Sequence, residues 1–123
     1  MHAADTNVVV RLLRQDHPQQ GAAAERLFAS GEVWIAKTVL LETAWVLTSA
    51  YALAAKEVIA ALSKLIRLPN VIAEDRTAVE TALQLAAAGL DFADALHLSS
   101  RPPGTMFVSF DKRLVKRAQR GRM

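Results

Sequence analysis

The stretch Leu90-Asp91-Phe92-Ala93-Asp94-Ala95-Leu96-His97-Leu98 decides how the chain is interpreted. Gly89 is placed to end a preceding helix, and Asp91 stands where the N-cap of a new helix is expected. Apolar residues then occupy almost every side of that helix, which predicts that it is buried. Asp94 lies inside the apolar run, with no Lys or Arg one turn away on either side. Because a buried carboxylate is costly unless something pairs with it, the stretch predicts a partner for Asp94 elsewhere in the chain or in a bound cation.

Composition bounds the class of protein. A chain of 123 residues, of which 52% are hydrophobic, predicts a single domain over residues 1–123 with one core. The absence of cysteine excludes disulfides and thiolate metal sites. The first apolar stretch is short and is interrupted by Asp5, so we expect neither a signal peptide nor a membrane span, and we expect a cytoplasmic protein without membrane contact.

Short apolar runs alternate with longer helical patterns along the whole chain. Strands are expected at His2–Ala4, Val33–Ala36, Val71–Ala73 and Met106–Ser109. Helices are expected to begin after Asp5, at Asp16-His17-Pro18, at Thr38, at Ala54, at Asp75, after Asp91 and at Asp111. This alternation favours an α/β fold with a short, mainly parallel sheet covered by helices on both faces. In such folds the functional site lies at the carboxyl ends of the strands.

Acidic residues follow the strands at that edge of the expected sheet. Asp5 and Asp111 each stand between a strand and a helix, and Glu42 lies about one turn into the helix after another strand. N-capping explains Asp5 and Asp111 taken singly, and is worth about 1 kcal/mol. It explains neither Glu42 nor Asp94. A salt bridge to a lysine is the structural explanation for Glu42, with Lys37 and Lys56 as the candidates.

Four carboxylates gathered at one edge would repel one another and raise each other's pKa values. A divalent cation removes that repulsion, and oxygen ligands favour Mg²⁺ or Mn²⁺ over Zn²⁺. The three histidines are too scattered for a zinc site. His97 is interpreted as a packed or hydrogen-bonded side chain rather than a ligand. Trp45 is interpreted as core or dimer surface rather than a base-stacking platform.

The positive charge is concentrated at the end of the chain. The formal net charge is only +3, yet the last thirteen residues hold Lys112, Arg113, Lys116, Arg117, Arg120 and Arg122 against Asp111 alone. Such a run is either a solvated helix face or a surface that follows phosphates. The surface that follows phosphates would suit an anionic substrate, which bound cations would connect to the acidic residues.

Four motifs in order resemble the PIN-domain pattern. They are Asp5-Thr6-Asn7, Glu42 in Leu41-Glu42-Thr43-Ala44-Trp45, Asp94 in Phe92-Ala93-Asp94-Ala95-Leu96, and Ser109-Phe110-Asp111-Lys112-Arg113. The likeness covers essentially the whole chain, and its nearest subgroup resembles the VapC-type toxins of prokaryotic toxin–antitoxin pairs. It implies a PIN-like three-layer α/β/α sandwich.

The resemblance also implies an activity, that of a metal-dependent endoribonuclease. The Mg²⁺ or Mn²⁺ ligands and catalytic residues would be Asp5, Glu42, Asp94 and Asp111. Residues that orient them would be Thr6, Asn7 and Ser109, and the candidates for phosphate contacts are Arg11, Lys112 and Arg113. Asp91 is either the N-cap of the Asp94 helix or a further acid of the site. A homodimer and a cognate antitoxin, which blocks the cleft, are the implied protein partners, and RNA is the implied substrate.

Three other interpretations compete with the nuclease. A haloacid-dehalogenase-type phosphatase needs a second Asp two residues after Asp5, where this chain has Asn7. A receiver-type phosphoacceptor domain would leave Asp94 without a role. A non-catalytic, basic RNA-binding module would use the acids only as caps and salt bridges, and then replacing Asp94 would not change metal binding.

Overall fold

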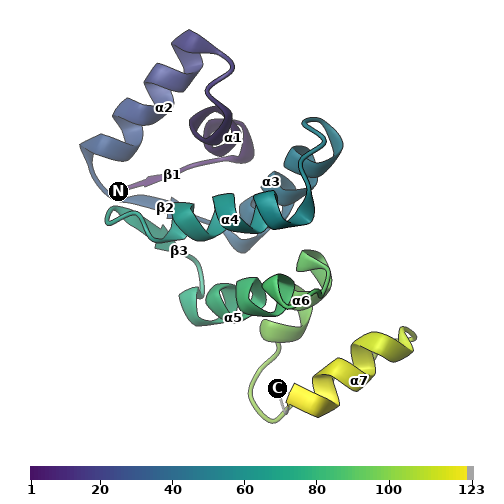
Figure 1. Cartoon of the computed structure of the whole chain (residues 1–123). Helices are drawn as coiled ribbons and strands as arrows, with labels where there is room; N and C mark the ends of the chain where they lie inside the picture. The colour runs from purple at the N-terminus through teal and green to yellow at the C-terminus, as the bar shows by residue number, and fades with distance from the viewer. Residues whose placement is uncertain (122–123) are drawn as a thin grey trace. The chain divides into compact units, whose positions relative to one another are not determined.

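The computed structural model describes residues 1–121, with side chains through Gln119 (Figure 1). Arg122 and the side chain of Arg120, both part of the basic run, lie outside that description. The elements in chain order are β1 (His2–Ala3), α1 (Thr6–Arg14), α2 (Pro18–Ser30), β2 (Val33–Ile35), α3 (Lys37–Ser49), α4 (Ala55–Ile66), β3 (Val71–Ala73), α5 (Arg76–Ala87), α6 (Phe92–Ser99) and α7 (Lys112–Gly121).

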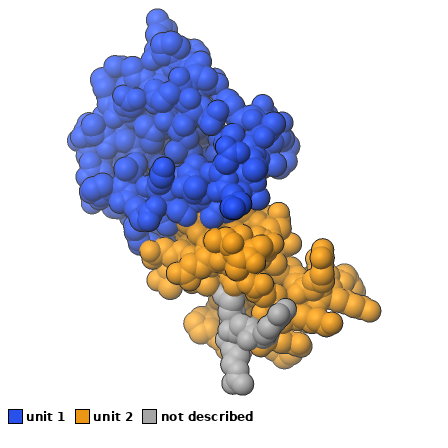
Figure 2. Space-filling view, viewed as in Figure 1, with its two compact units in different colours: residues 1–76 blue, residues 77–123 orange. Residues whose placement is uncertain are grey.

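The chain divides into two compact units, which Figure 2 distinguishes by colour. Unit 1 is Met1–Arg76 and unit 2 is Thr77–Met123. Unit 1 holds the whole sheet, whereas the regular structure of unit 2 is helical over its described residues. The mixed α/β class predicted from the alternating pattern is confirmed.

The sheet of unit 1 has three parallel strands in the order β1-β2-β3. Val33 is in register with His2 on one side and with Val71 on the other. Val33 and Ile35 of the central strand point to the same face of the sheet and are fully buried, whereas Trp34 between them points to the other face and is partly exposed. Helices flank this sheet, with α1 packed on α2 and α3, α3 on α4, and α4 on β3.

The start of α3 differs from its prediction. The helix begins at Lys37, and Ala36 rather than Thr38 occupies the N-cap position without a side-chain capping bond. The carboxylate of Glu74, which follows β3, instead accepts a hydrogen bond of 2.8 Å from the Lys37 backbone N–H. The cap therefore comes from a residue far away in the sequence, and no local pattern could reveal it.

Unit 2 is built around the inner faces of three helices. Val79 and Ala82 of α5 and Ala95 and Leu98 of α6 are fully buried. Leu98 packs with two residues of α7, Leu114 and Ala118, and the partly buried Leu85, Leu90 and Phe107 cover this cluster. Gly89, at a φ of 114°, lies in the turn that follows the end of α5, as its position predicted.

The strand expected at Met106–Ser109 is wrong, because this segment pairs with no other strand in the part of the chain that the structure describes. Its side chains nevertheless alternate. Phe107 packs on the Leu98 cluster, while Met106, Val108 and Phe110 are 85%, 88% and 107% exposed. The alternation of side chains was therefore predicted correctly. The segment is not a strand because, among the described residues, no neighbouring strand forms backbone hydrogen bonds with it.

No helix within residues 1–121 has the length and apolar character needed to cross a membrane.

Candidate functional site

The first predicted ligand, Asp5, connects β1 to α1. Its carboxylate caps α1 by accepting a hydrogen bond of 3.2 Å from the Val8 backbone N–H. The following residue, Thr6, is buried, and its hydroxyl donates a hydrogen bond to the carboxylate of Glu42. Since Glu42 lies on α3, this bond links the Asp5-Thr6-Asn7 motif to the second acidic motif.

Glu42 lies in α3, the helix that follows β2, as predicted, and its side chain is exposed. Of the two lysines considered as its partner, Lys37 donates to Asp75 at 3.2 Å. The partner that the structure gives Glu42 is the Thr6 hydroxyl. A neutral donor holds one carboxylate oxygen in place and leaves the negative charge of Glu42 available to a cation.

Asp94 lies in the first turn of α6 and is partly exposed, so the expectation that it is fully buried was wrong. Burial is the largest cause that raises its pKa, followed by the negative charges of Asp91 and Asp111; His97 acts in the opposite sense. His97 itself is exposed, which corrects its interpretation as a packed side chain. Unit 2 thus gathers three acids whose charges repel one another.

Two of these three acids also anchor helices. Asp91 is the N-cap of α6, as predicted, and accepts a hydrogen bond of 3.2 Å from the Asp94 backbone N–H. Asp111 caps α7 by accepting from the backbone N–H groups of Arg113 (3.0 Å) and Leu114 (3.2 Å). The Ser109 hydroxyl accepts a hydrogen bond of 3.0 Å from the Asp111 backbone N–H. The capping contacts fix the direction of both carboxylates.

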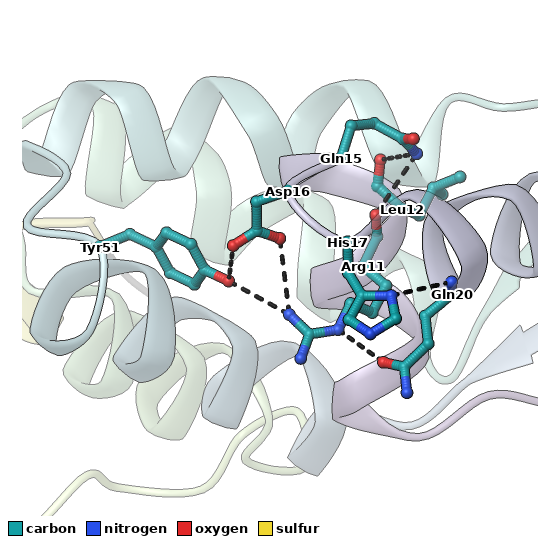
Figure 3. A network of polar contacts seen from close by, with 7 residues as sticks. All are labelled: Arg11, Leu12, Gln15, Asp16, His17, Gln20 and Tyr51. Carbon is teal, nitrogen blue, oxygen red and sulfur yellow. Dashed lines mark hydrogen bonds and ion pairs between the residues drawn. The ribbon is translucent and has the colours of Figure 1, made fainter.

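The basic residues proposed for phosphate contacts fall into two kinds. Lys112 and Arg113 are exposed in the first turn of α7, directly after Asp111. Arg11 is engaged within unit 1 (Figure 3): its guanidinium donates to Gln20 at 2.7 Å and contacts Asp16 at 3.5 Å. These contacts use the Nε and Nη1 nitrogens of Arg11, so a phosphate would have to meet its Nη2 nitrogen or replace one of them.

A polar network around Tyr51 was not predicted. The Tyr51 hydroxyl donates to Asp16 at 2.7 Å and accepts from Arg11 at 3.4 Å (Figure 3). The Arg14 guanidinium lies 5.1 Å from the centroid of the Tyr51 ring. The hydrogen bond to Tyr51 lowers the pKa of Asp16, and the same bond raises that of Tyr51. Through this network the connection between α1 and α2 contacts the residues that follow α3. Sequence spacing does not reveal a contact between positions so far apart.

The donor chemistry of the acids suits a hard divalent cation, because carboxylate and hydroxyl oxygens are its preferred ligands. The carboxylates of Asp91, Asp94 and Asp111 in unit 2 repel one another, and a divalent cation would neutralise their negative charge. Among the described residues no group of three or more His, Asp or Glu side chains is arranged to hold a metal ion. Asp5 and Glu42 belong to unit 1 and Asp94 and Asp111 to unit 2, so each unit supplies two of the four predicted ligands.

Asn7 is exposed at the second position of α1, with no hydrogen bond to either predicted ligand of its unit among those described. Trp45 is 68% exposed on α3, so of its two predicted roles the core position is wrong and the dimer surface stays a prediction.

Comparison with known proteins identifies the chain at the level of a family. The PIN domain family matches residues 3–120, nearly the whole sequence and both units. No curated protein and no solved structure matches significantly. The four acidic motifs, the parallel sheet and this match agree: the chain belongs to the PIN domain family.

Proposed function

We propose that this protein is a metal-dependent endoribonuclease. PIN domains are generally metal-dependent nucleases, which gives the reaction class. The observation that carries the proposal for this chain is the environment of Asp94, where burial first, and then the negative charges of Asp91 and Asp111, raise the pKa of its carboxyl group. Close carboxylates without a cationic side chain between them are unfavourable in a purely structural role and favourable around a divalent cation.

The proposed ligands of Mg²⁺ or Mn²⁺ are Asp5, Glu42, Asp94 and Asp111. Such an ion lowers the pKa of a bound water and stabilises negative charge on a phosphodiester. Among the protein's own groups, Thr6 orients the Glu42 carboxylate by donating to it, and Asp91 and Ser109 hold the backbone at Asp94 and Asp111. A carboxylate left free of a helix cap can accept the proton of the attacking water.

Lys112 and Arg113 are the proposed phosphate contacts beside the acids, and Asn7 is proposed to orient Asp5 or a bound water. Arg11 of unit 1 is proposed as a further phosphate contact. The biological role we propose is that of the toxin of a toxin–antitoxin pair in the cytoplasm, acting as a homodimer. Its antitoxin would block the acids, and an Arg or Lys side chain is the group that an acidic site would accept.

One observation favours the non-catalytic alternative, a basic RNA-binding module. Asp5, Asp91 and Asp111 all cap helices, which is a sufficient structural reason for three of the acids. Glu42 and Asp94 have no such role, so these two residues separate the alternatives.

The test is calorimetric titration of Mn²⁺ into the folded wild type, Asp94→Asn and Glu42→Gln. The control is Glu25→Gln, which removes one exposed carboxylate from α2. We expect the wild type and the control to bind alike, and both site variants to bind at least about 100-fold more weakly, since even residues that only orient metal ligands are worth 10- to 100-fold. A single-stranded RNA pool should then be cut only by the proteins that bind Mn²⁺. Equal Mn²⁺ binding by all four proteins would overturn the nuclease and support the RNA-binding module.

A further inference from the structure

Helix α7, the last helix in Figure 1, has one face committed to packing. Leu114 and Ala118 are buried at 5% and 8% exposure and pack with Leu98 of α6. They are four residues apart, so they lie one above the other on the same side of the helix. The orientation of α7 about its own axis in unit 2 is thereby fixed.

The opposite side of α7 is basic. Lys112 and Lys116 form one row four residues apart, and Arg113 and Arg117 form the adjacent row. Lys112, Arg113 and Lys116 are exposed, and Arg117 is partly exposed. Among the side chains that the structure describes, no carboxylate forms an ion pair with any of these four. Their positive charges are therefore available to a ligand.

A large exposed aromatic side chain precedes this basic face. Phe110 is 107% exposed, whereas the adjacent Asp111 has its carboxylate turned to the backbone of α7. An aromatic ring left in water beside a row of cations is the combination found where proteins bind single-stranded nucleic acid, because bases stack on the ring while phosphates meet the cations. A duplex would hide the base faces that Phe110 could stack on.

We propose that Phe110 and the basic face of α7 form a binding strip for single-stranded RNA. The strip consists of Phe110, Lys112, Arg113, Lys116 and Arg117. Residues four apart on a helix rise by about 6 Å, which approaches the spacing of consecutive phosphates along a strand, so each row can follow the backbone from one phosphate to the next. This assignment rests on the proposed ribonuclease function and extends it: the strip holds the strand next to the phosphodiester that the acids act on.

An acidic peptide fits the strip less well than RNA does. Asp111 stands at one end of the strip, and the negative charges of Asp111 and Asp91 both act on Asp94. These acids would repel an acidic peptide, whereas a divalent cation can join them to a phosphodiester. The arrangement of cations, aromatic ring and acids along unit 2 therefore matches a phosphate-bearing strand.

The first experiment measures binding of a fluorescently labelled single-stranded RNA to the full chain by anisotropy, in EDTA and at several salt concentrations. The variant is Lys112→Gln with Lys116→Gln. The control is Lys56→Gln with Lys64→Gln, which removes the same charge from exposed positions of α4 in unit 1. Each phosphate contact contributes about 0.7 to the slope of log affinity against log salt for a single strand. We expect the α7 variant to lose about 1.4 from this slope, and the control to keep the wild-type slope. Equal slopes in the variant and the control would overturn the strip.

The second experiment examines the aromatic ring alone. Phe110→Ala should lower the affinity for single-stranded RNA by at least about 5-fold, the weakest effect expected for one stacked base, with an unchanged salt slope. Phe110→Trp should retain the wild-type affinity. If Phe110→Ala leaves the affinity unchanged and instead alters the molecular mass in light scattering, Phe110 belongs to a protein interface and the stacking role is refuted.

These results are distinguishable from a failure of the nuclease proposal. Binding in EDTA needs no metal, so a strip that binds RNA in a protein that never cuts it would refute the nuclease and retain the strip. Metal-dependent cutting by the wild type, with RNA affinity and salt slope unaffected by the α7 changes, would retain the nuclease and refute the strip.

Discussion

The two units treat their acidic residues differently. In unit 1, a backbone N–H donates to Asp5 and the Thr6 hydroxyl donates to Glu42, so each predicted ligand is held by a neutral donor. In unit 2, burial raises the pKa of Asp94, and the negative charges of two further carboxylates, Asp91 and Asp111, raise it further. Neutral donors position a carboxylate without cancelling its charge, whereas neighbouring carboxylates raise the free energy of the ionised state until a cation arrives.

The two units are also stabilised by different kinds of interaction. Unit 1 is held by a parallel sheet whose central strand buries Val33 and Ile35, together with the polar network around Tyr51. Unit 2 depends on side-chain packing between helices, centred on Leu98. Mutations that affect one unit and not the other are therefore the direct way to examine the difference.

The largest effect is expected from emptying either core. Leu98→Ala and Leu62→Ala each remove a fully buried side chain, one from each unit, and each should cost about 2–5 kcal/mol of unfolding free energy. Hydrogen exchange followed by mass spectrometry should show the greater loss of protection in the unit that holds the mutation. Equal loss in both units from either change would show that they unfold as one cooperative body.

The next effect concerns the donor that distinguishes unit 1. Thr6→Val removes the hydroxyl that donates to Glu42 while keeping the shape of the side chain. We expect Mn²⁺ affinity or cleavage to fall about 10- to 100-fold, the usual cost of losing a group that orients a metal ligand. Thr6→Ser keeps the hydroxyl and should stay near wild type in the same titration. A Thr6→Val protein with unchanged affinity would mean that the bond has no part in metal binding.

A smaller effect separates the two roles of Asp91 in unit 2. Asp91→Ala removes the cap of α6 and should cost about 1 kcal/mol, while Asp91→Asn keeps a capping oxygen and should retain most of that stability. Asp91→Asn also removes a negative charge beside Asp94. The Asp94 pKa, measured by NMR titration, should therefore move down towards its ordinary value of 3.8. A carboxyl group whose pKa is raised by folding stabilises the folded state in its protonated form, and this stability is lost as pH rises through the raised pKa. Because the Asp94 pKa is raised less in Asp91→Asn, that protein should lose less stability over this pH range than the wild type.

The smallest effect is a titration in unit 1. Tyr51 is the one tyrosine of the chain, so tyrosinate absorbance reports it alone. Its hydrogen bond to Asp16 should place its pKa above the ordinary value of 10.0, and Asp16→Asn should bring it back down. Any stability from this bond is present at neutral pH and is lost as pH rises through the raised pKa. A tyrosine pKa that is identical in both proteins would show that the bond does not persist in solution.

The sequence predicted those features that depend on neighbouring residues. Val33–Ile35 and Val71–Ala73 form strands because short apolar runs between turn signals require burial, and Asp5, Asp91 and Asp111 cap helices because each stands directly before a helical pattern. The order of the acidic motifs also led to the family that the comparison found.

Features that depend on distant residues were missed. Glu74 caps α3 from beyond β3, and Tyr51 joins Asp16 from the far end of α3. The expected strand at Met106–Ser109 failed for the same reason, since an alternating pattern specifies a face but not a hydrogen-bonded neighbour. The metal roles of Asp5, Glu42, Asp94 and Asp111 remain predictions that the titrations test.

The position of Trp45 has an optical consequence. The two tryptophans and the single tyrosine, Trp34, Trp45 and Tyr51, all lie in unit 1, and unit 2 has only phenylalanine as an aromatic residue. Intrinsic fluorescence excited at the indole band therefore reports unit 1 alone. Trp45, at 68% exposure, should emit at long wavelength and be quenched readily by acrylamide, whereas Trp34 in the central strand should emit further to the blue. A Trp45→Phe protein would then carry one emitter inside the sheet, and an unfolding curve recorded from it would be blind to α5, α6 and α7.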